Sequence, residues 1–294
     1  MSKITAVAFK TIFIQILFAI FVQNAVAQTD VPVSKDSVEA SCNNVASANR
    51  PYTVSSWVVS YGDMYLRDTY LSNLRYLGWN VGLDVLHTGF FRDRQGTTPI
   101  YWKNINTITY GNTINVPATA AITYYSGEFG FGVGYSRLLR QFDIRAGGYA
   151  SLLLGMKNNS RNINNIVSAD AALNLRLDLE ATYRLRFRKT ALYLSDNLQL
   201  PLIGVMFVPE YGALYYKTSL NSMADNLHFS SLHNRKGIHN RFEVSLAFSN
   251  VILKLQHYIN YQYWTANDLY FSCLQHNVGF GLVMYLRNVT RDFR

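Results

Sequence analysis

The fold is decided by the stretch VSADAALNLRLDLEATYRLRFR, residues 167–188. Its odd positions carry Val, Ala, Leu, Tyr and Phe, whereas nearly all even positions carry Ser, Asp, Asn, Arg, Glu or Thr. Because successive side chains of a strand point to opposite faces, this alternation puts one face in an apolar medium and the other among polar groups. If the stretch were a helix, charged side chains would lie on all of its sides and no apolar face would remain. The stretch also exceeds the roughly 5–6 residues of an ordinary strand, whereas a tilted membrane strand can project beyond the bilayer.

The same two-residue period recurs along the chain. It is clear at 77–85, at 122–137 and near the end at 277–286, where glycines often occupy the second face. Weaker versions lie at 53–65, 100–112, 141–157, 190–200, 239–249 and 251–264. An open sheet would leave unpaired edges in lipid. The pattern therefore predicts an all-β protein, a closed antiparallel transmembrane up-and-down β-barrel of about 10 strands, with 12 as the alternative.

The N-terminus carries an export signal. Lys3 and Lys10 precede an apolar core, Thr11 to Val22, and Ala25-Val26-Ala27 forms a small-residue cleavage site. This is the pattern of a secretory signal peptide. An exported barrel is expected in the outer membrane of a Gram-negative cell. An even number of strands returns both termini to the periplasm. The predicted divisions are a signal peptide at 1–27, a flexible periplasmic lead-in at 28–50, the barrel at 51–287 and a C-terminal tail at 288–294.

Composition excludes several classes. The chain of 294 residues has 27 Lys+Arg against 18 Asp+Glu, and 14% of it is aromatic. Such apolar content argues against disorder, and two cysteines, Cys42 and Cys273, are too few for a disulfide scaffold. No basic run or recognition-helix pattern indicates nucleic acid, so we expect the positive charge to serve contacts with outer-membrane lipid and lipopolysaccharide.

Connection lengths alternate, as in outer-membrane barrels with short periplasmic turns and longer extracellular loops. Tight turns are predicted at 188–189, 249–250 and 140–141, and longer connections at 66–75, 113–117, 158–165, 201–238 and 265–269, with 91–99 the exception. The long extracellular loop is therefore 201–238. Its apolar run Pro201–Gly212 is predicted either to fold over the barrel mouth or to continue a strand above the membrane, because an exposed run would be sticky.

Charged residues on the second face are predicted to line the lumen. Facing lipid, each arginine would cost about 2–4 kcal/mol near the midplane. We interpret the set as a structural ion-pair network in a mostly filled lumen, in preference to a narrow conduit for ions or protons. The predicted network comprises Asp143, Arg145, Arg176, Asp178, Glu180, Arg184 and Arg186.

The densest His/Ser/Asn group offers candidate catalytic residues: His228, Ser230, His233 and Asn234. A Ser nucleophile, a His base and an Asn orienter could serve lipid hydrolysis or modification. Proximity in sequence does not establish geometry, so we favour a polar network that ties the loop to the rim. The histidines show no metal-ligand spacing, and no cofactor motif is present. Cys42 and Cys273 could bridge in the periplasm or remain free.

Three strings, Asp68–Ser72, Pro201–Gly212 and Leu227–Asn234, resemble an uncharacterised family of Gram-negative outer-membrane β-barrels, a domain of unknown function. The resemblance spans about Tyr52 to Leu286, although Asn73 stands where the family pattern has proline. It implies an exported barrel and no established activity, ligand or catalytic residues. We therefore expect a non-enzymatic envelope protein whose 201–238 loop contacts lipopolysaccharide, a glycan or a partner. The alternatives are an outer-membrane lipid hydrolase or lipid-modifying enzyme, and a narrow channel.

Overall fold

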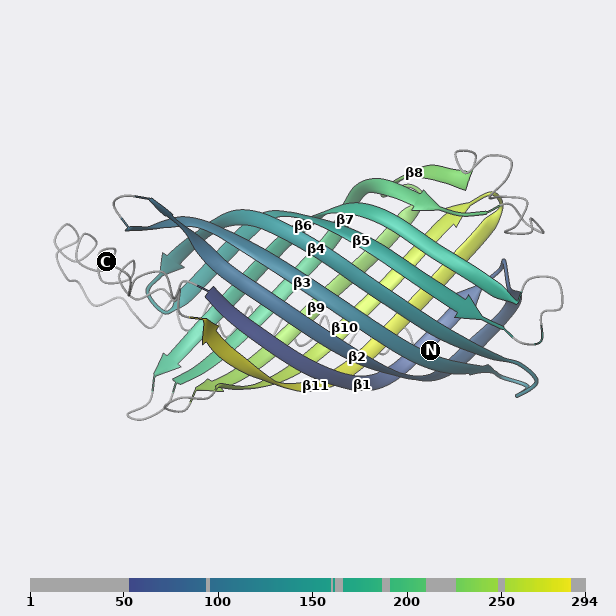
Figure 1. The fold of residues 1–294 in the computed structure, drawn as a ribbon, viewed down its shortest axis with the longest axis horizontal. Coiled ribbons are helices and arrows are strands. Elements are labelled where there is room, and N and C mark those ends of the chain that lie inside the picture. The colour runs from purple at the N-terminus through teal and green to yellow at the C-terminus, as the bar shows by residue number, and fades with distance from the viewer. Residues whose placement is uncertain are drawn as a thin grey trace, which may run out of the picture. The chain divides into compact units, whose positions relative to one another are not determined.

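The described chain consists of antiparallel strands joined in sequence order (Figure 1). The computed structural model describes residues 53–93, 96–159, 161, 166–186, 191–209, 226–247 and 252–286, all within the compact unit Ala46–Arg294. The predicted signal peptide, lead-in and C-terminal tail lie outside these residues. The strands are β1 (Thr53–Asp68), β2 (Ser72–Asp93), β3 (Gly96–Asn115), β4 (Ala121–Leu139), β5 (Phe142–Asn158), β6 (Val167–Arg186), β7 (Ala191–Phe207), β8 (Leu227–Ser231), β9 (Arg235–Ala247), β10 (Ile252–Ala266) and β11 (Leu269–Leu286).

Ten of these strands close into a barrel. β1 pairs with β11 along its whole length, from Thr53 opposite Leu286 to Asp68 opposite Phe271, and β6 pairs with β7. β8 is an extra strand beside the upper part of β7, whose lower part pairs with β9. The predicted closed antiparallel up-and-down barrel is confirmed. Within the described ranges, no helix has the length and hydropathy needed to cross a membrane.

The strand register sets the width of the barrel. Followed from Gly62 through β2, β3, β4 and β5, the pairing reaches Ser168 on β6. Followed the other way, through β11, β10, β9 and β7, it reaches Glu180. For ten strands, this stagger of 12 residues corresponds to a tilt of about 40° and to a lumen that side chains can fill. The strands run obliquely in Figure 1.

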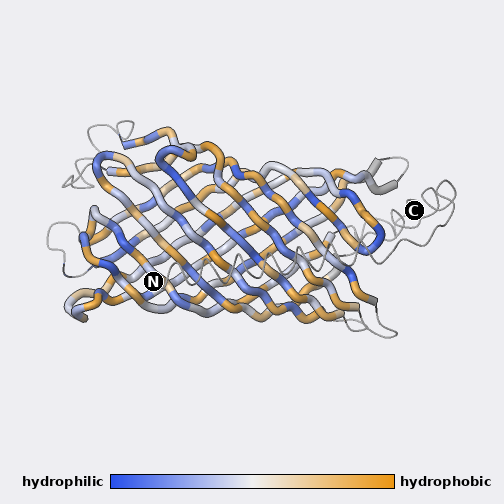
Figure 2. The backbone as a smooth tube through the Cα atoms, turned by 180° about the vertical axis from the view of Figure 1, so that it is seen from behind, coloured by the Kyte–Doolittle hydropathy of each residue, from blue (hydrophilic) through white to orange (hydrophobic). Residues whose placement is uncertain are grey.

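Burial is inverted relative to a soluble protein. On β6, Leu173 is 56% exposed and Leu175 is 44% exposed, whereas Arg176, which faces the lumen, is only 2% exposed. Figure 2 shows the same alternation of apolar and polar residues along most strands. Apolar side chains therefore cover the outside, and polar ones fill the lumen.

The strands meet at two unlike ends. The terminus end holds Thr53, Leu286 and the connections at 94–95, 140–141, 187–190 and 248–251; the loop end holds those at 69–71, 116–120, 159–166, 208–226 and 267–268. Asn267 and Asp268 both have positive φ (52° and 57°), as a tight two-residue hairpin requires. The expected longer connection at 91–99 is wrong, because β2 continues to Asp93 and β3 starts at Gly96.

The segment predicted as one long loop, 201–238, is also different. β7 continues to Phe207, β8 occupies Leu227–Ser231 and β9 begins at Arg235, so the apolar run continues a strand. Alternation fails here because both faces are apolar: Val205 is exposed on the outside, and Met206 is buried in the lumen. A register shift opposite Leu175/Arg176 further interrupts the period.

Candidate functional site

The loop-end half of the lumen is filled by an apolar cluster. Its members include Met64, Leu66, Tyr76, Ile122, Tyr124, Leu153, Met206, Trp264, Phe271 and Cys273. Tyr70 and Leu71, from the β1–β2 turn, and Val208, after β7, complete it across the mouth. The Asn267 side chain donates a hydrogen bond to the Val208 carbonyl, at 2.9 Å. This half of the lumen is therefore a packed plug.

A charged group lies inside this apolar plug. The Lys157 ammonium forms ion pairs with Asp68 and with Asp170, the latter at 2.8 Å. It also lies 4.0 Å from the centroid of the Phe271 ring. Asp68 accepts a hydrogen bond from the Tyr70 backbone N–H at 3.0 Å. Lys157 thus joins β1, β5 and β6 and ties the β1–β2 turn to the plug.

Two tyrosines cross the middle of the lumen above glycines of β4. The Tyr149 hydroxyl donates to the Ile105 carbonyl, and the Tyr101 hydroxyl donates to Asp178, both at 3.0 Å. A Cβ on Gly130 would lie 2.2 Å from the Tyr149 hydroxyl oxygen, so only glycine leaves room for this ring. The glycine face predicted for a narrow lumen therefore accommodates inward tyrosines.

The terminus-end half holds a chain of ion pairs. Arg145 lies 2.7 Å from Asp143 and 3.0 Å from Glu180. Lys103 bridges Glu180, at 2.6 Å, and Asp178, at 2.9 Å. Lys103 was not among the residues predicted for the network. Its signal was available, because Lys103 alternates with outward residues in the weak 100–112 segment.

The other predicted network residues lie apart from this chain. Arg176 forms an ion pair with Glu128 and donates to Gln199 at 3.4 Å. Arg184 donates to the Tyr193 hydroxyl at 2.9 Å. The Arg186 side chain lies outside the described side chains. The structure therefore brings Asp143, Arg145, Asp178 and Glu180 together through Lys103, and it places Arg176 and Arg184 in other contacts.

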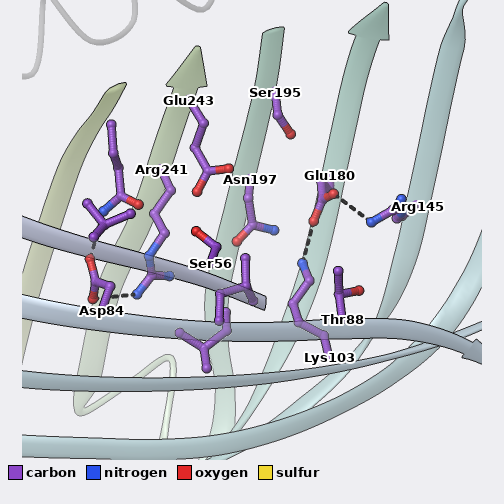
Figure 3. A pocket seen from close by; sticks show the side chains of 14 residues that line it. Ser56, Asp84, Thr88, Lys103, Arg145, Glu180, Ser195, Asn197, Arg241 and Glu243 are labelled. Carbon is purple, nitrogen blue, oxygen red and sulfur yellow. Dashed lines mark hydrogen bonds and ion pairs between the residues drawn. The ribbon is translucent and has the colours of Figure 1, made fainter. Parts of the chain in front are cut away.

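A small polar cavity of about 40 Å³ lies beside this network (Figure 3). In the picture Glu180 lies between Lys103 and Arg145, while Asp84 and Arg241 face each other. A water needs roughly 10–15 Å³, so the cavity has room for only a few. Its charged lining residues are Asp84, Lys103, Arg145, Glu180, Arg241 and Glu243. The cavity is therefore lined by both carboxylates and basic side chains.

The four candidate catalytic residues do not form the hydrogen bonds that a catalytic set would need. His228 Nε2 and Ser230 Oγ are buried, and neither has a hydrogen-bond partner among the described residues. His233 Nδ1 instead lies 2.5 Å from Ser231 Oγ, a residue that the sequence analysis did not single out. Asn234 holds this turn by donating to the Phe229 carbonyl at 2.8 Å. A Ser–His pair exists here, but it is an exposed turn contact.

The structure also shows where possible metal ligands and one of the two cysteines lie in the described part of the chain. No group of three His, Cys, Asp or Glu residues there could hold a metal ion. Cys273 is a free cysteine buried in the plug. Cys42 lies outside the described residues, so the two alternatives of a bridged or a free pair both stand as the sequence left them.

Several solved barrels are similar in structure at low identity. The transport unit of the autotransporter AIDA-I from Escherichia coli has a TM-score of 0.43 and 8% identity, covering 90% of this chain and 96% of its own. The outer membrane protease OmpT from Escherichia coli has a TM-score of 0.40 and 7% identity, covering 80% and 97%. The β domain of the Bordetella autotransporter BrkA has a TM-score of 0.36 and 10% identity, covering 80% and 100%.

No curated protein matches the chain. A family model does, and it matches nearly all of the sequence, residues 12–292. The family is described as "Protein of unknown function (DUF3316)". This extent confirms the resemblance to an uncharacterised family, and the chain belongs to DUF3316.

Proposed function

We propose that this chain is an exported, non-enzymatic barrel of the outer membrane that does not conduct and that binds a ligand or partner at its loop end. Its outer face supports a membrane location. Tyr61, Trp79, Tyr110 and Tyr125 form a row of exposed rings across β1 to β4, with successive centroids 6.4, 5.6 and 5.1 Å apart. Such aromatic rows are typical of the interfacial girdles of outer-membrane barrels.

The packed plug is the observation that carries the central part of the proposal, a lumen that does not conduct. Its side chains come from strands all around the barrel, and Tyr76, Tyr124 and Phe271 are each at most 2% exposed. An ion entering this half would have to displace close-packed apolar side chains and lose its hydration. The lumen is therefore closed to passive diffusion, and a channel function is disfavoured.

Planar-bilayer recording tests this closure. We expect no steady conductance from the wild-type barrel. A matched variant, Tyr76→Ala with Tyr124→Ala and Phe271→Ala, removes three rings from the plug and should conduct. Steady wild-type conductance equal to that of the variant would contradict the proposal.

We further propose that the loop end contacts lipopolysaccharide, a glycan or a protein partner. The outward face of β8 and the following turn support this idea, because Leu227, Phe229 and Leu232 are exposed there. Scattered exposed apolar residues are ordinary, but three within six positions make a local patch. The opposite, terminus end would then face the periplasm, as the even strand count predicts.

Trimming the loop tests the contact. Replacing residues 211–225 with a short Gly/Ser linker keeps Asn226, whose carbonyl accepts a hydrogen bond from the Val208 N–H at 2.9 Å. The barrel should therefore still fold and remain heat-modifiable on a gel. Binding to lipopolysaccharide-coated beads should fall, and further with Phe229→Ser. Unchanged binding by both variants would contradict the proposed surface, whereas the conductance test would be unaffected.

A further inference from the structure

A group of basic side chains lies in the middle of the lumen, between the plug and the polar cavity. Arg176 comes from β6, and Arg235, His239 and Arg241 come from the inward face of β9. Their exposed fractions lie between 2% and 7%. Arg176 donates a hydrogen bond to Gln199, which lies opposite His239 in the β7–β9 pairing, and Arg235 and Arg241 flank His239 along β9. We call these four side chains the arginine cluster.

The arginine cluster has too few carboxylates. Arg176 is paired with Glu128, and the nearest carboxylate oxygen to Arg241, from Asp84, is 3.9 Å away. Arg235 has no ion pair with any described residue; its guanidinium stacks over the Trp264 ring, with its carbon 5.2 Å from the centroid. A buried charge without a partner is expensive. Arg235 is therefore a buried charge that its contacts with the described residues leave incompletely satisfied.

Two arginines of the cluster and two polar residues of β6 and β8 carry unused hydrogen-bonding atoms. Arg235 Nη1, Arg176 Nε, Asn174 Nδ2 and Ser230 Oγ are all buried without a hydrogen-bond partner in the described part of the chain. Asn174, Gly204 and Ser230 face one another across β6, β7 and β8. A Cβ on Gly204 would lie 3.0 Å from Ser230 Oγ and 3.1 Å from Asn174 Cα, so these two polar residues are neighbours. All four atoms can donate hydrogen bonds.

We propose that Arg235 and Arg176 of the arginine cluster, together with Asn174 and Ser230, bind an oxyanion group, either a carboxylate or a phosphate. Arg235 is the principal ligand, and the other three residues are further donors. A guanidinium presents N–H groups in a planar fork that matches both anions. Buried donors that the protein leaves unused are what such a ligand would satisfy.

Replacing Arg235 separates this site from a purely structural cluster. If Arg235 were only a buried charge, Arg235→Met should leave anion binding unchanged and could even stabilise the barrel. If it binds an anion, the loss of a charged hydrogen bond should weaken binding by at least about tenfold. Arg184→Met is the matched control, because Arg184 is also an inward arginine but contacts Tyr193 near the terminus end.

Equilibrium dialysis of the detergent-folded full-length barrel provides the test, with radiolabelled inorganic phosphate and radiolabelled acetate as separate probes at constant ionic strength. We expect saturable binding of at least one probe near one per chain, lost in Arg235→Met and kept in Arg184→Met. The probe that binds more tightly distinguishes phosphate from carboxylate recognition. Saturable binding of neither probe, or equal binding by wild type and Arg235→Met, would overturn the proposal.

A second variant covers the case in which Arg235→Met does not fold. Ser230→Ala removes a hydroxyl that has no hydrogen bond among the described residues, so folding should be unaffected. It should nevertheless weaken anion binding, by about three- to tenfold for one neutral donor. Unchanged affinity in Ser230→Ala would remove this residue from the site and, with an unfolded Arg235→Met, would refute the assigned set of ligands.

Discussion

Removing the Lys157 ammonium should strongly destabilise the barrel. Lys157 is buried among Trp264 and Phe271 and is the shared partner of Asp68 and Asp170. In Lys157→Met the aliphatic volume is largely kept, while two carboxylates are left buried in an apolar plug. Breaking a buried ion pair from one side costs about 3–5 kcal/mol. We therefore expect the free energy of unfolding to fall by about this amount.

The same reasoning predicts a rescue. The triple variant Lys157→Met, Asp68→Asn and Asp170→Asn has no buried charge at this position, and Asn at 68 keeps an oxygen for the Tyr70 N–H. Neutral replacement of a buried ion pair is often tolerated, so the triple variant should recover at least half of the loss. Lys236→Met, at an exposed lysine of β9, is the control and should change stability by about 0.5 kcal/mol or less.

Urea titration of the barrel folded in lipid vesicles, followed by tryptophan fluorescence, measures these differences. A loss below about 1 kcal/mol in Lys157→Met would refute the assignment of an uncompensated charge, because surface ion pairs give values in that range. A triple variant no more stable than the single one would refute it as well. In that case packing, and not charge, would account for the loss.

Two other predictions follow from close contacts. Gly130→Ala should destabilise the barrel by about 1–3 kcal/mol, because the new Cβ would lie 2.2 Å from the Tyr149 hydroxyl. Adding Tyr149→Leu should restore part of this loss in the same urea assay. A Gly130→Ala variant as stable as wild type would contradict the contact. Phospholipid hydrolysis should be no higher for wild type than for Ser230→Ala, Ser231→Ala or His233→Ala, because the Ser231–His233 contact is an isolated turn; activity that any of these substitutions abolishes would restore the hydrolase hypothesis.

The fold was predictable where the lumen is polar. Along β6, Asn174, Arg176 and Asp178 alternate with exposed leucines, and the two-residue period gives both strand and facing. Beside the plug the lumen is apolar, so β7 near Met206 has two apolar faces and the period disappears. β8 was missed for a related reason, since Leu227–Ser231 is short and follows a long connection. The pattern thus depends on a difference in polarity that the plug removes.

The site was less predictable than the fold. Alternation tells which residues face inward, but the stagger between strands decides which of them meet across the lumen. Lys103 and Glu180 are 77 positions apart in the chain, and only the closed register brings them to 2.6 Å. Arg235 lies in the segment predicted as the loop 201–238, and Arg241 lies in the weak segment 239–249, so no local signal distinguished them. Which inward side chains meet across the lumen therefore depends on the register in which the barrel closes.

The central claim is that Leu173, Leu175, Leu177 and Leu179 face lipid while Asn174, Arg176 and Asp178 face a filled lumen. Nitroxide labels placed one at a time at positions 173–179, in a Cys42→Ser, Cys273→Ala barrel in liposomes, test it directly by electron paramagnetic resonance. We predict high collision rates with oxygen at the odd positions and low rates with both oxygen and a water-soluble nickel complex at the even ones. Oxygen collision rates without a two-residue period, or nickel access at the leucine positions, would contradict the claim.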